Sequence, residues 1–432
     1  MSRTEGLDVV VNIADIKSEK KLPNGWIDKK VSEFTVEHKQ GYYTKESYTG
    51  FGTYLIRITD LNNPNINYSK MPKLVVEEKE FNQFKVEVGD FLFARSGAIG
   101  RYGIVTEDFP SVFASYLIRF RFNQEAVSTR YFGYAYESDI CQKQLGAITQ
   151  GSSNININAD NIKSLLIPYP PLPEQQKIAE ILTSVDEVIE KTQAQIDKLK
   201  DLKTGMMQEL LTNGIGHTEF KGSPVGRVPA EWEVMQMRDI CITKQGLQIP
   251  ISERYTEPAE NRFVYLTIKF INTGFNPSVA EYIENPSQRV VCDESDIILA
   301  RTGATGKVVT GIKGVFHNNF FKVDYDRDKI RKNYFVHYLN SPFIQTEIKK
   351  RAGTTTIPDL NHGDFYALPL LLPTLDEQIR IAKILDANDD FIGVKTRKLE
   401  ALISTKKALM QDLLTGKVRV KTETTNTEVA VS

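Results

Sequence analysis

Two glycine-rich segments are the first candidates for chemistry in this 432-residue chain, because glycine loops can cradle phosphate groups. Gly97-Ala-Ile-Gly100 and Gly303-Ala-Thr-Gly306 each follow a short apolar run. Their glycine spacing differs from that of a dinucleotide-binding loop, and no helix plainly follows either segment. We therefore expect tight turns between strands, with direct contact to a phosphate backbone as the alternative.

An arginine precedes each glycine segment, at Arg95 and Arg301. A guanidinium group can bind a phosphate or a base edge, and it can equally form an ion pair inside the domain, so both roles stay open. The same blocks add four polar candidates, of which the two cations are better placed for phosphate: Ser96, Thr302, Arg101 and Lys307.

Polar and aromatic loops supply the remaining candidates for nucleic-acid contact. Tyr42-Tyr-Thr-Lys45 has its counterpart near Lys244-Gln-Gly-Leu-Gln248, and Gln150-Gly-Ser-Ser-Asn154 has its counterpart at Thr354-Thr-Thr356. The alternative is that such loops are only solvated. His317-Asn-Asn319 can form a base-reading cluster, although a lone histidine is more often structural. The individual candidates are Tyr42, Tyr43, Lys45, Gln150, Ser152, Ser153, Asn154, Lys244, Gln245, Asn318, Thr354, Thr355 and Thr356.

The composition indicates a globular chain of at least two domains. Hydrophobic residues make up 41% of the sequence and charged residues 25%, which excludes a mostly disordered chain. No apolar run approaches the roughly 20 residues that cross a bilayer, and acidic residues occupy the place of a signal peptide, so we expect a cytoplasmic protein. Three widely spaced cysteines indicate neither a disulfide framework nor a zinc site, and we expect no metal.

The charge balance lacks the usual signature of a nucleic-acid binder. The net charge is -1, residues 23–170 hold 16 basic and 16 acidic residues, and residues 218–372 hold 19 and 18. Because neutralised phosphates supply most non-specific affinity, the isolated chain is expected to bind nucleic acid weakly.

The chain repeats itself with an offset slightly above 200 residues. The run Glu174–Leu182 matches Glu377–Leu385 at six of nine positions, and the Asp90–Gly100 block resembles Asp296–Gly306. In each half, short apolar runs between Gly, Pro and Asn clusters predict strands and turns. Helical stretches at 131–144 and 334–350 make each half a mixed α/β domain.

A long helix is predicted after each globular half, entered at a proline and ended near Asn213-Gly214 or Gly416. Steps of four and three residues give matching heptad seams, about 55 Å long, typical of an antiparallel coiled coil with a pseudo-twofold axis. The apolar seam residues are Ile178, Leu182, Val185, Ile189, Ile196, Leu199, Met206 and Leu210, and then Ile381, Leu385, Ile392, Leu399, Leu402, Leu409 and Leu413.

Polar residues interrupt both seams at equivalent layers, Thr192 with Lys395 and Lys203 with Lys406. Buried polar groups can fix the register of a coiled coil, and lysines can instead extend to an acidic partner surface. The sequence does not choose between these two roles.

The order of these blocks resembles the specificity (S) subunits of type I restriction-modification systems. The most specific block is Pro170-Pro-Leu-Pro-Glu-Gln175, repeated as Leu372-Pro-Thr-Leu-Asp-Glu-Gln378 with one proline fewer, and Ser295 stands where the strand block has its usual glycine. The resemblance leaves out only about twenty N-terminal residues and the polar tail. It implies an N-terminal segment (1–22), target recognition domains (23–170 and 218–372), helical regions (171–217 and 373–420) and a disordered tail (421–432).

The resemblance also implies the function. Each domain would read one half of a bipartite asymmetric DNA target, while the helices set the gap and dock two methyltransferase subunits, which restriction subunits join for cleavage. The chain carries no methyltransferase tetrapeptide and no Walker loop, so we expect no catalytic residues and no cofactor here, with S-adenosylmethionine, ATP and magnesium belonging to the partner subunits. The alternative is a structural adaptor whose domains bind protein. The target sequence and the gap length cannot be read from the chain.

Overall fold

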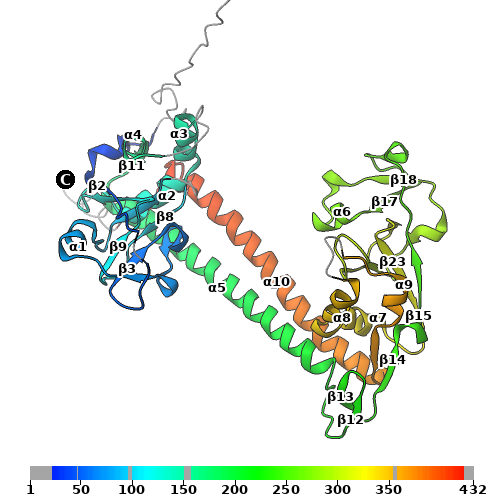
Figure 1. Ribbon diagram of the computed structural model, residues 1–432. Coiled ribbons are helices and arrows are strands. Elements are labelled where there is room, and N and C mark those ends of the chain that lie inside the picture. Colours follow the sequence, from blue (N-terminus) through cyan, green and yellow to red (C-terminus); the bar gives the residue numbers. More distant parts are fainter. Residues whose placement is uncertain (1–21, 46, 96–99, 150–156, 354–357, 423–432) are drawn as a thin grey trace, which may run out of the picture. The chain divides into compact units, whose positions relative to one another are not determined.

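The computed structural model describes residues 22–45, 47–95, 100–149, 157–353 and 358–422 (Figure 1). Its contacts divide the chain into two units, residues 1–191 with 399–432, and residues 192–398. Each unit holds one globular domain and parts of two long helices, α5 (Leu172–Leu210) and α10 (Leu375–Leu414). This division cuts both helices, whereas the predicted domain boundaries follow the chain, so those boundaries stay a prediction.

An antiparallel four-stranded sheet frames the first unit. Its order is β2 (Thr35–Gln40), β10 (Leu117–Phe122), β7 (Phe91–Ala94) and β8 (Tyr102–Ile104). A second sheet has the order β6 (Lys73–Leu74), β3 (Thr53–Ile56) and β9 (Ser111–Phe113), and β4 (Leu61–Asn62) pairs with β5 (Asn65–Ile66) while β1 (Ile27–Lys30) pairs with β11 (Leu166–Tyr169). The shorter helices are α1 (Glu78–Phe84), α2 (Thr129–Glu137), α3 (Asp139–Thr149) and α4 (Ala159–Ser164).

The second unit repeats this frame. Its antiparallel four-stranded sheet has the order β15 (Cys241–Gln245), β23 (Phe320–Tyr325), β20 (Ile297–Ala300) and β21 (Val308–Thr310). The next sheet has the order β16 (Arg254–Tyr255), β18 (Tyr282–Glu284), β17 (Arg262–Leu266), β22 (Gly314–Phe316) and β19 (Val291–Cys292), and two further pairs join β12 (Phe220–Ser223) to β13 (Gly226–Pro229) and β14 (Glu233–Gln236) to β24 (Pro369–Leu372). The shorter helices are α6 (Ile268–Asn272), α7 (Lys332–Asn340), α8 (Pro342–Ala352) and α9 (His362–Tyr366).

The two units confirm the predicted tandem mixed α/β architecture. The four-stranded sheet has the same strand order in both, whereas the neighbouring sheet has three strands in one and five in the other. Both neighbouring sheets contain a parallel pair, β3 with β9 and β17 with β22. The duplicated halves therefore share one sheet and differ in the other.

Each of the two predicted helical stretches, 131–144 and 334–350, is in fact two helices. The backbone is extended at Ser138 (φ -64°, ψ 152°) and at Ser341 (φ -65°, ψ 147°), which ends α2 and α7. The Ser341 hydroxyl accepts a hydrogen bond from the amide of Ile344, and proline occupies the first position of α8. Serine caps therefore break a pattern that apolar periodicity alone predicts to be continuous.

A Glu-Gln pair attaches the start of each long helix to its globular domain. In the first unit Glu174 accepts from the Trp26 indole at 3.0 Å, and in the second Glu377 accepts from the Trp232 indole at 2.9 Å. The next residue accepts a backbone hydrogen bond from the domain in both units, Gln175 from Ser128 and Gln378 from Arg331. The recurring Glu-Gln block is therefore a joint between helix and domain.

The two long helices run antiparallel within each unit. In the first unit Glu174 contacts Arg419 at 2.6 Å, and Asp186, further along α5, contacts Lys406 at 2.8 Å. Since Lys406 precedes Arg419 in the chain, the two segments run in opposite directions. In the second unit Lys203 contacts Asp389 at 2.6 Å. Of the seam lysines, Lys203 and Lys406 thus each pair with an aspartate of the same unit. Every predicted seam position is buried or partly buried, while the complete coiled coil and its twofold axis stay a prediction.

Candidate functional site

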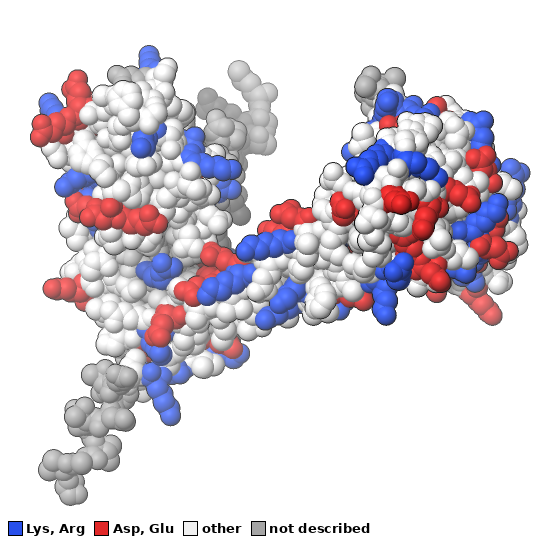
Figure 2. All heavy atoms as spheres, turned by 90° about the horizontal axis from the view of Figure 1, so that it is seen from below, with Lys and Arg blue, Asp and Glu red and all other residues white. Residues whose placement is uncertain are grey.

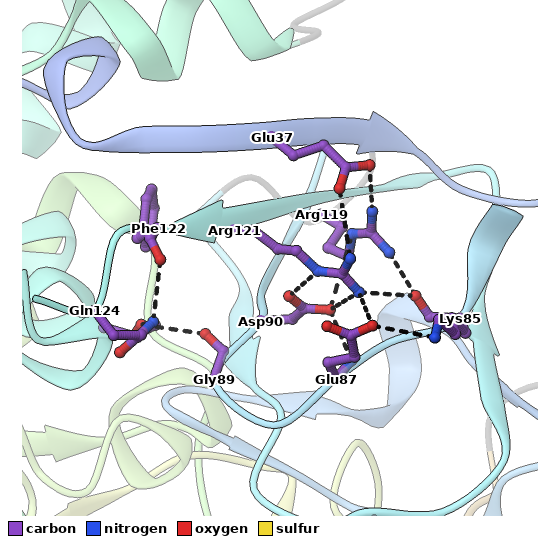
Figure 3. Close-up of polar contacts among 10 residues, drawn as sticks. Glu37, Lys85, Glu87, Gly89, Asp90, Arg119, Arg121, Phe122 and Gln124 are labelled. Atoms are coloured by element: carbon purple, nitrogen blue, oxygen red, sulfur yellow. Dashed lines mark hydrogen bonds and ion pairs between the residues drawn. The ribbon is translucent and has the colours of Figure 1, made fainter. Parts of the chain in front are cut away.

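A cluster of charged side chains, of which Arg119 and Asp90 are buried, lies in the first domain between β2, β10 and the turn before β7 (Figure 3). Arg119, whose side chain is 2% exposed, donates to Glu37 at 2.6 Å, and Arg121 donates to Asp90 at 2.8 Å. Asp90 also accepts from the backbone amide of Glu87 at 2.8 Å. Burial raises the pKa of Asp90, against the opposing effect of its hydrogen bond to Arg121.

The partners of this cluster lie within the domain, so its role is structural. The second domain places Lys322 on the strand equivalent to β10, where its ammonium group contacts Asp296 at 2.6 Å. Asp296 likewise accepts from the backbone amide of Asp293 at 2.9 Å. Asp90 and Asp296, the aspartates of the repeated strand block, thus each close a turn and neutralise a cation on the neighbouring strand. These contacts are those of a structural ion pair and not of a catalytic residue.

Three segments of the first domain meet at one end of the four-stranded sheet. The turn from β9 to β10 comprises Ala114, Ser115 and Tyr116, and the Leu117 amide donates back to the Ala114 carbonyl at 2.8 Å. The Arg95 amide donates to the Tyr116 carbonyl at 3.0 Å. From the end of β2, the side chain of Gln40 donates to the Ser115 carbonyl at 3.3 Å and the Gly41 amide donates to the Leu117 carbonyl at 3.0 Å.

The second domain builds the same arrangement from different residues. The turn from β22 to β23 comprises His317, Asn318 and Asn319, and the Arg301 amide donates to the Asn319 carbonyl at 2.7 Å. The Gln245 side chain donates to the Asn318 carbonyl at 3.3 Å, as Gln40 does in the first domain. We call these two segments, 114–116 and 317–319, the variable turns.

The predicted tyrosines of the first domain separate into one core residue and one surface residue. Tyr42 is 8% exposed, donates from its hydroxyl group to Glu80 at 3.0 Å and packs beside Phe84. Tyr43 is 68% exposed, and Lys45 is exposed as well. Tyr42 therefore belongs to the core, whereas Tyr43 and Lys45 remain available on the surface.

Arg301 is bound within its own domain. Its guanidinium contacts Asp359 at 2.6 Å, and Thr302 forms an isolated β-bridge with Asp359. These contacts favour the structural role of Arg301 over contact with DNA. Arg95 is partly exposed, and its backbone carbonyl accepts from the Ile157 amide at 2.9 Å.

The two predicted phosphate-binding cations are exposed. Lys307 contacts the side-chain oxygen of Asn272 at 3.2 Å, and Arg101 contacts the Ile58 carbonyl at 3.5 Å. In the second glycine segment, Gly303 and Gly306 have φ angles of 81° and 90°, so this segment is a turn between β20 and β21 that requires glycine.

The remaining predicted residues of the second domain lie at or near the variable turn. Lys244 pairs with Asp324 at 2.8 Å, and this hydrogen bond raises the pKa of Lys244. His317 accepts from the Asn319 amide at 3.1 Å through Nδ1, and burial lowers its pKa, so the neutral ring supports the turn. Eight predicted residues lie outside the described residues: Ser96, Gln150, Ser152, Ser153, Asn154, Thr354, Thr355 and Thr356.

Sequence reasoning missed Ser115 and Tyr116, whereas Asn319 lies in the segment His317–Asn319 that it had named. Tyr116 is 61% exposed, although an aromatic ring on a tight turn usually packs against its domain. Their position in the chain could have identified them, because each turn immediately precedes the strand that carries the ion-paired cation, Arg119 on β10 and Lys322 on β23. Divergence of the two copies at that position hid the equivalence.

One face of the molecule carries mixed charge. In the view of Figure 2, basic and acidic side chains are interspersed on both globular domains, without a broad face of one sign. No helix in the described part of the chain is long and apolar enough to cross a membrane. The three cysteines are buried and unpaired, and within the described ranges no group of His, Cys, Asp and Glu is arranged to hold a metal ion.

Comparison with known proteins gives one consistent result. A family model described as "Type I restriction modification DNA specificity domain" matches residues 23–201 and again residues 229–403. The MjaX type I restriction enzyme specificity subunit of Methanocaldococcus jannaschii is 29% identical over 412 residues, covering 93% of this chain and 95% of the relative. The MjaVIII specificity subunit of the same organism is 30% identical over 302 residues, covering 66% and 70%.

Solved structures agree on the fold. The S subunit of a type I restriction-modification system from M. genitalium matches with a TM-score of 0.59 at 17% identity, covering 91% of this chain and 98% of that one. A chain from a structure described as "Structural basis underlying complex assembly and conformational transition of the type I R-M system" matches with a TM-score of 0.55 at 18% identity, covering 92% and 100%.

Proposed function

This chain belongs to the type I restriction-modification DNA specificity family, and from that premise we propose that each globular domain reads one half of a bipartite, asymmetric DNA target. The chain is the non-catalytic specificity subunit of such a system. The observation that carries the proposal is duplication with divergence, because the four-stranded sheet recurs while the neighbouring sheet changes from three strands to five. Two readers built on one frame with different surfaces suit two unlike half-sites.

We also propose that the long helices dock two methyltransferase subunits and set the gap between the half-sites. Outside its buried seam, α10 carries a second apolar stripe in the second unit, formed by Ile384, Ala387, Phe391 and Val394. Phe391 is 63% exposed and Val394 is 54% exposed. Spacings of three, four and three residues are those of a second heptad seam, so this stripe suits an amphipathic partner helix.

The chemistry belongs to the partners in this proposal. The methyltransferase subunits would bring S-adenosylmethionine, and restriction subunits would bring ATP and magnesium and join for cleavage. We place this assembly in the cytoplasm, where it meets DNA. The balanced charge supports partners that close around the duplex, since residues 23–170 hold 16 basic and 16 acidic residues and residues 218–372 hold 19 and 18, which leaves little net charge to neutralise phosphates.

Co-purification tests this proposal against the protein-binding adaptor. The tagged full-length chain is co-expressed with the methyltransferase subunit of the same system, captured, and incubated with a random-sequence duplex pool. We expect recovery of the methyltransferase subunit and enrichment of duplexes that share a two-part motif. A complex that retains no DNA, or retains it without any shared motif, would favour the adaptor instead.

A further inference from the structure

We propose that the variable turns read bases, through Ser115 and Tyr116 in the first domain and through Asn318 and Asn319 in the second. The inference rests on the proposed function, because it requires that both domains bind DNA. It adds the residues that make the two half-sites different.

The first support is that both turns are held by one set of hydrogen bonds. Besides the bonds from Arg95 or Arg301 and from Gln40 or Gln245, the Tyr42 amide donates to Phe113 at 2.7 Å, as the Leu247 amide donates to Phe316 at 3.2 Å. The closing bond also recurs, since the Phe320 amide donates to the His317 carbonyl at 2.9 Å. The backbone of the turn is thus the same in both domains, whatever residues it carries.

Close backbone contact fixes this frame. A Cβ atom at Gly41 would lie 2.1 Å from the Ala114 carbonyl oxygen, and one at Gly246 would lie 2.4 Å from the His317 carbonyl oxygen. Only glycine lets the end of the first sheet strand approach the turn so closely. The turn therefore presents its side chains from a rigid support, which suits a base contact that depends on position.

The second support is that the side chains on this shared frame differ in kind. The first domain carries a partly buried hydroxyl group and an exposed aromatic ring, whereas the second carries two partly buried amides in succession. An amide can bond the N6 and N7 atoms of adenine as a bidentate pair, while serine and tyrosine hydroxyl groups bond several bases. An identical scaffold with different base-bonding groups is what two readers of unlike half-sites need.

The third support is that the second turn is incompletely satisfied in the free chain. The Asn318 amide nitrogen donates to Gln248 at 3.4 Å, but among the described residues its buried side-chain oxygen has no hydrogen-bond partner. A buried acceptor without a donor is unfavourable, and a base amino group satisfies it once the side chain turns outward. By contrast, Arg301, which borders this turn, and Tyr42, which borders the turn of the first domain, are each paired inside their own domain.

The test exchanges the turn residues in the full-length chain. One variant carries Ser115→Asn with Tyr116→Asn, and the reciprocal variant carries Asn318→Ser with Asn319→Tyr. Val36→Asn is the matched control, because Val36 is a 70% exposed residue on β2 of the first domain and lies outside the turn. Each chain is expressed with the methyltransferase subunit, and methylated motifs are mapped by sequencing the host genome.

We expect each exchange to alter one position of one half-site, with adenine the expected new base for Tyr116→Asn. Purified variant complexes should bind a duplex carrying the parent motif about 5- to 150-fold more weakly, while binding to a duplex with that half-site scrambled is unchanged. The Val36→Asn complex should keep the parent motif and affinity.

Two results would overturn the inference. One is an unchanged motif with unchanged affinity in both exchange variants. The other is equal loss of binding to the parent and scrambled duplexes, which would show that the turns act through folding or assembly. Failure of the proposed function looks different, because the parent complex itself would then yield no two-part motif.

Discussion

The joint between Glu377 and Trp232 gives the most specific prediction about stability. The Glu377 side chain is 4% exposed and accepts at 2.9 Å from each of three donors, the Trp232 indole, the Ile215 amide and His217 Nε2. Glu377→Leu keeps a similar volume but removes all three acceptor contacts. The Trp232 indole is fully buried, so its N–H group then has no partner.

The expected cost follows from these donors. A buried donor left unpaired costs about 1–3 kcal/mol, and the partly buried Ile215 amide and His217 add less because water can reach them. We expect a total of about 3 kcal/mol. For a unit spanning residues 192–398, this lowers the unfolding temperature by roughly 6–12 °C, at about 2–4 °C per kcal/mol.

The two tryptophans make the assay specific to one unit. The chain has only Trp26 and Trp232, one in each unit, so a Trp26→Phe background leaves fluorescence that reports the second unit alone. Guanidinium unfolding in that background should show the loss for Glu377→Leu. Asp376→Asn, at an exposed carboxylate on the same helical turn, should change stability by less than about 1 kcal/mol.

Glu174→Leu, measured in a Trp232→Phe background, is the matched comparison in the first unit. Its ion-pair partner Arg419 is 45% exposed and can return to water, so only the Trp26 indole loses its acceptor and we expect about 1–2 kcal/mol. Should Glu377→Leu unfold within about 0.5 kcal/mol of its parent, the joint would not hold the helix to the domain and the reasoning would be wrong.

Three further predictions concern docking, the thiols and the spacing. The double variant Phe391→Glu with Val394→Lys should lower the recovery of the methyltransferase subunit about tenfold or more. Leu202→Glu, at a 53% exposed leucine outside the stripe, should not lower it. Equal recovery with the parent chain and both variants would show that the stripe is not a docking surface. Burial raises the pKa of Cys141 and Cys241 to about 12 and of Cys292 to about 11, so these thiols should resist Ellman's reagent at pH 8 until the chain is unfolded. Because the thiols of the unfolded chain lose their protons at lower pH, the stability of the folded chain should fall as pH rises above about 9. Rapid labelling of the folded chain would contradict this prediction. One heptad inserted after Ile196 and another after Leu399 lengthens each helix by about 10 Å, which should widen the gap by about three base pairs, and an active variant with the original gap would show that the helices do not set it.

Periodicity made the long helices predictable, because a heptad seam and its proline and glycine boundaries are local signals. Periodicity also predicted continuous helices across Ser138 and Ser341, which is wrong, because a serine cap ends a helix without changing its apolar pattern. The strand order was out of reach, because β10 pairs with β2 across some eighty residues and the pairing depends on tertiary contacts.

The candidate site was predictable where its residues lie in polar segments of the sequence. Gln245 and Asn318 were found because they lie in polar segments, and the structure joins them at one turn. Tyr42 looked like a surface reader, yet its hydroxyl bond to Glu80 and its burial make it a core residue. Tyr116 has only one polar neighbour in the turn, Ser115, to mark it. Its equivalence to Asn319 is visible in the structure, where an arginine amide donates to each carbonyl in the same way.

Mapping the methylated motif of the intact system decides whether the two domains read separate half-sites. The genome of a host expressing this chain with its methyltransferase subunit is sequenced, together with one in which residues 23–170 come from a relative of the family. We expect two unlike half-sites separated by a non-specific gap, with one half-site changed by the replacement and the other retained. A single continuous palindromic motif, or a replacement that changes both halves, would contradict it.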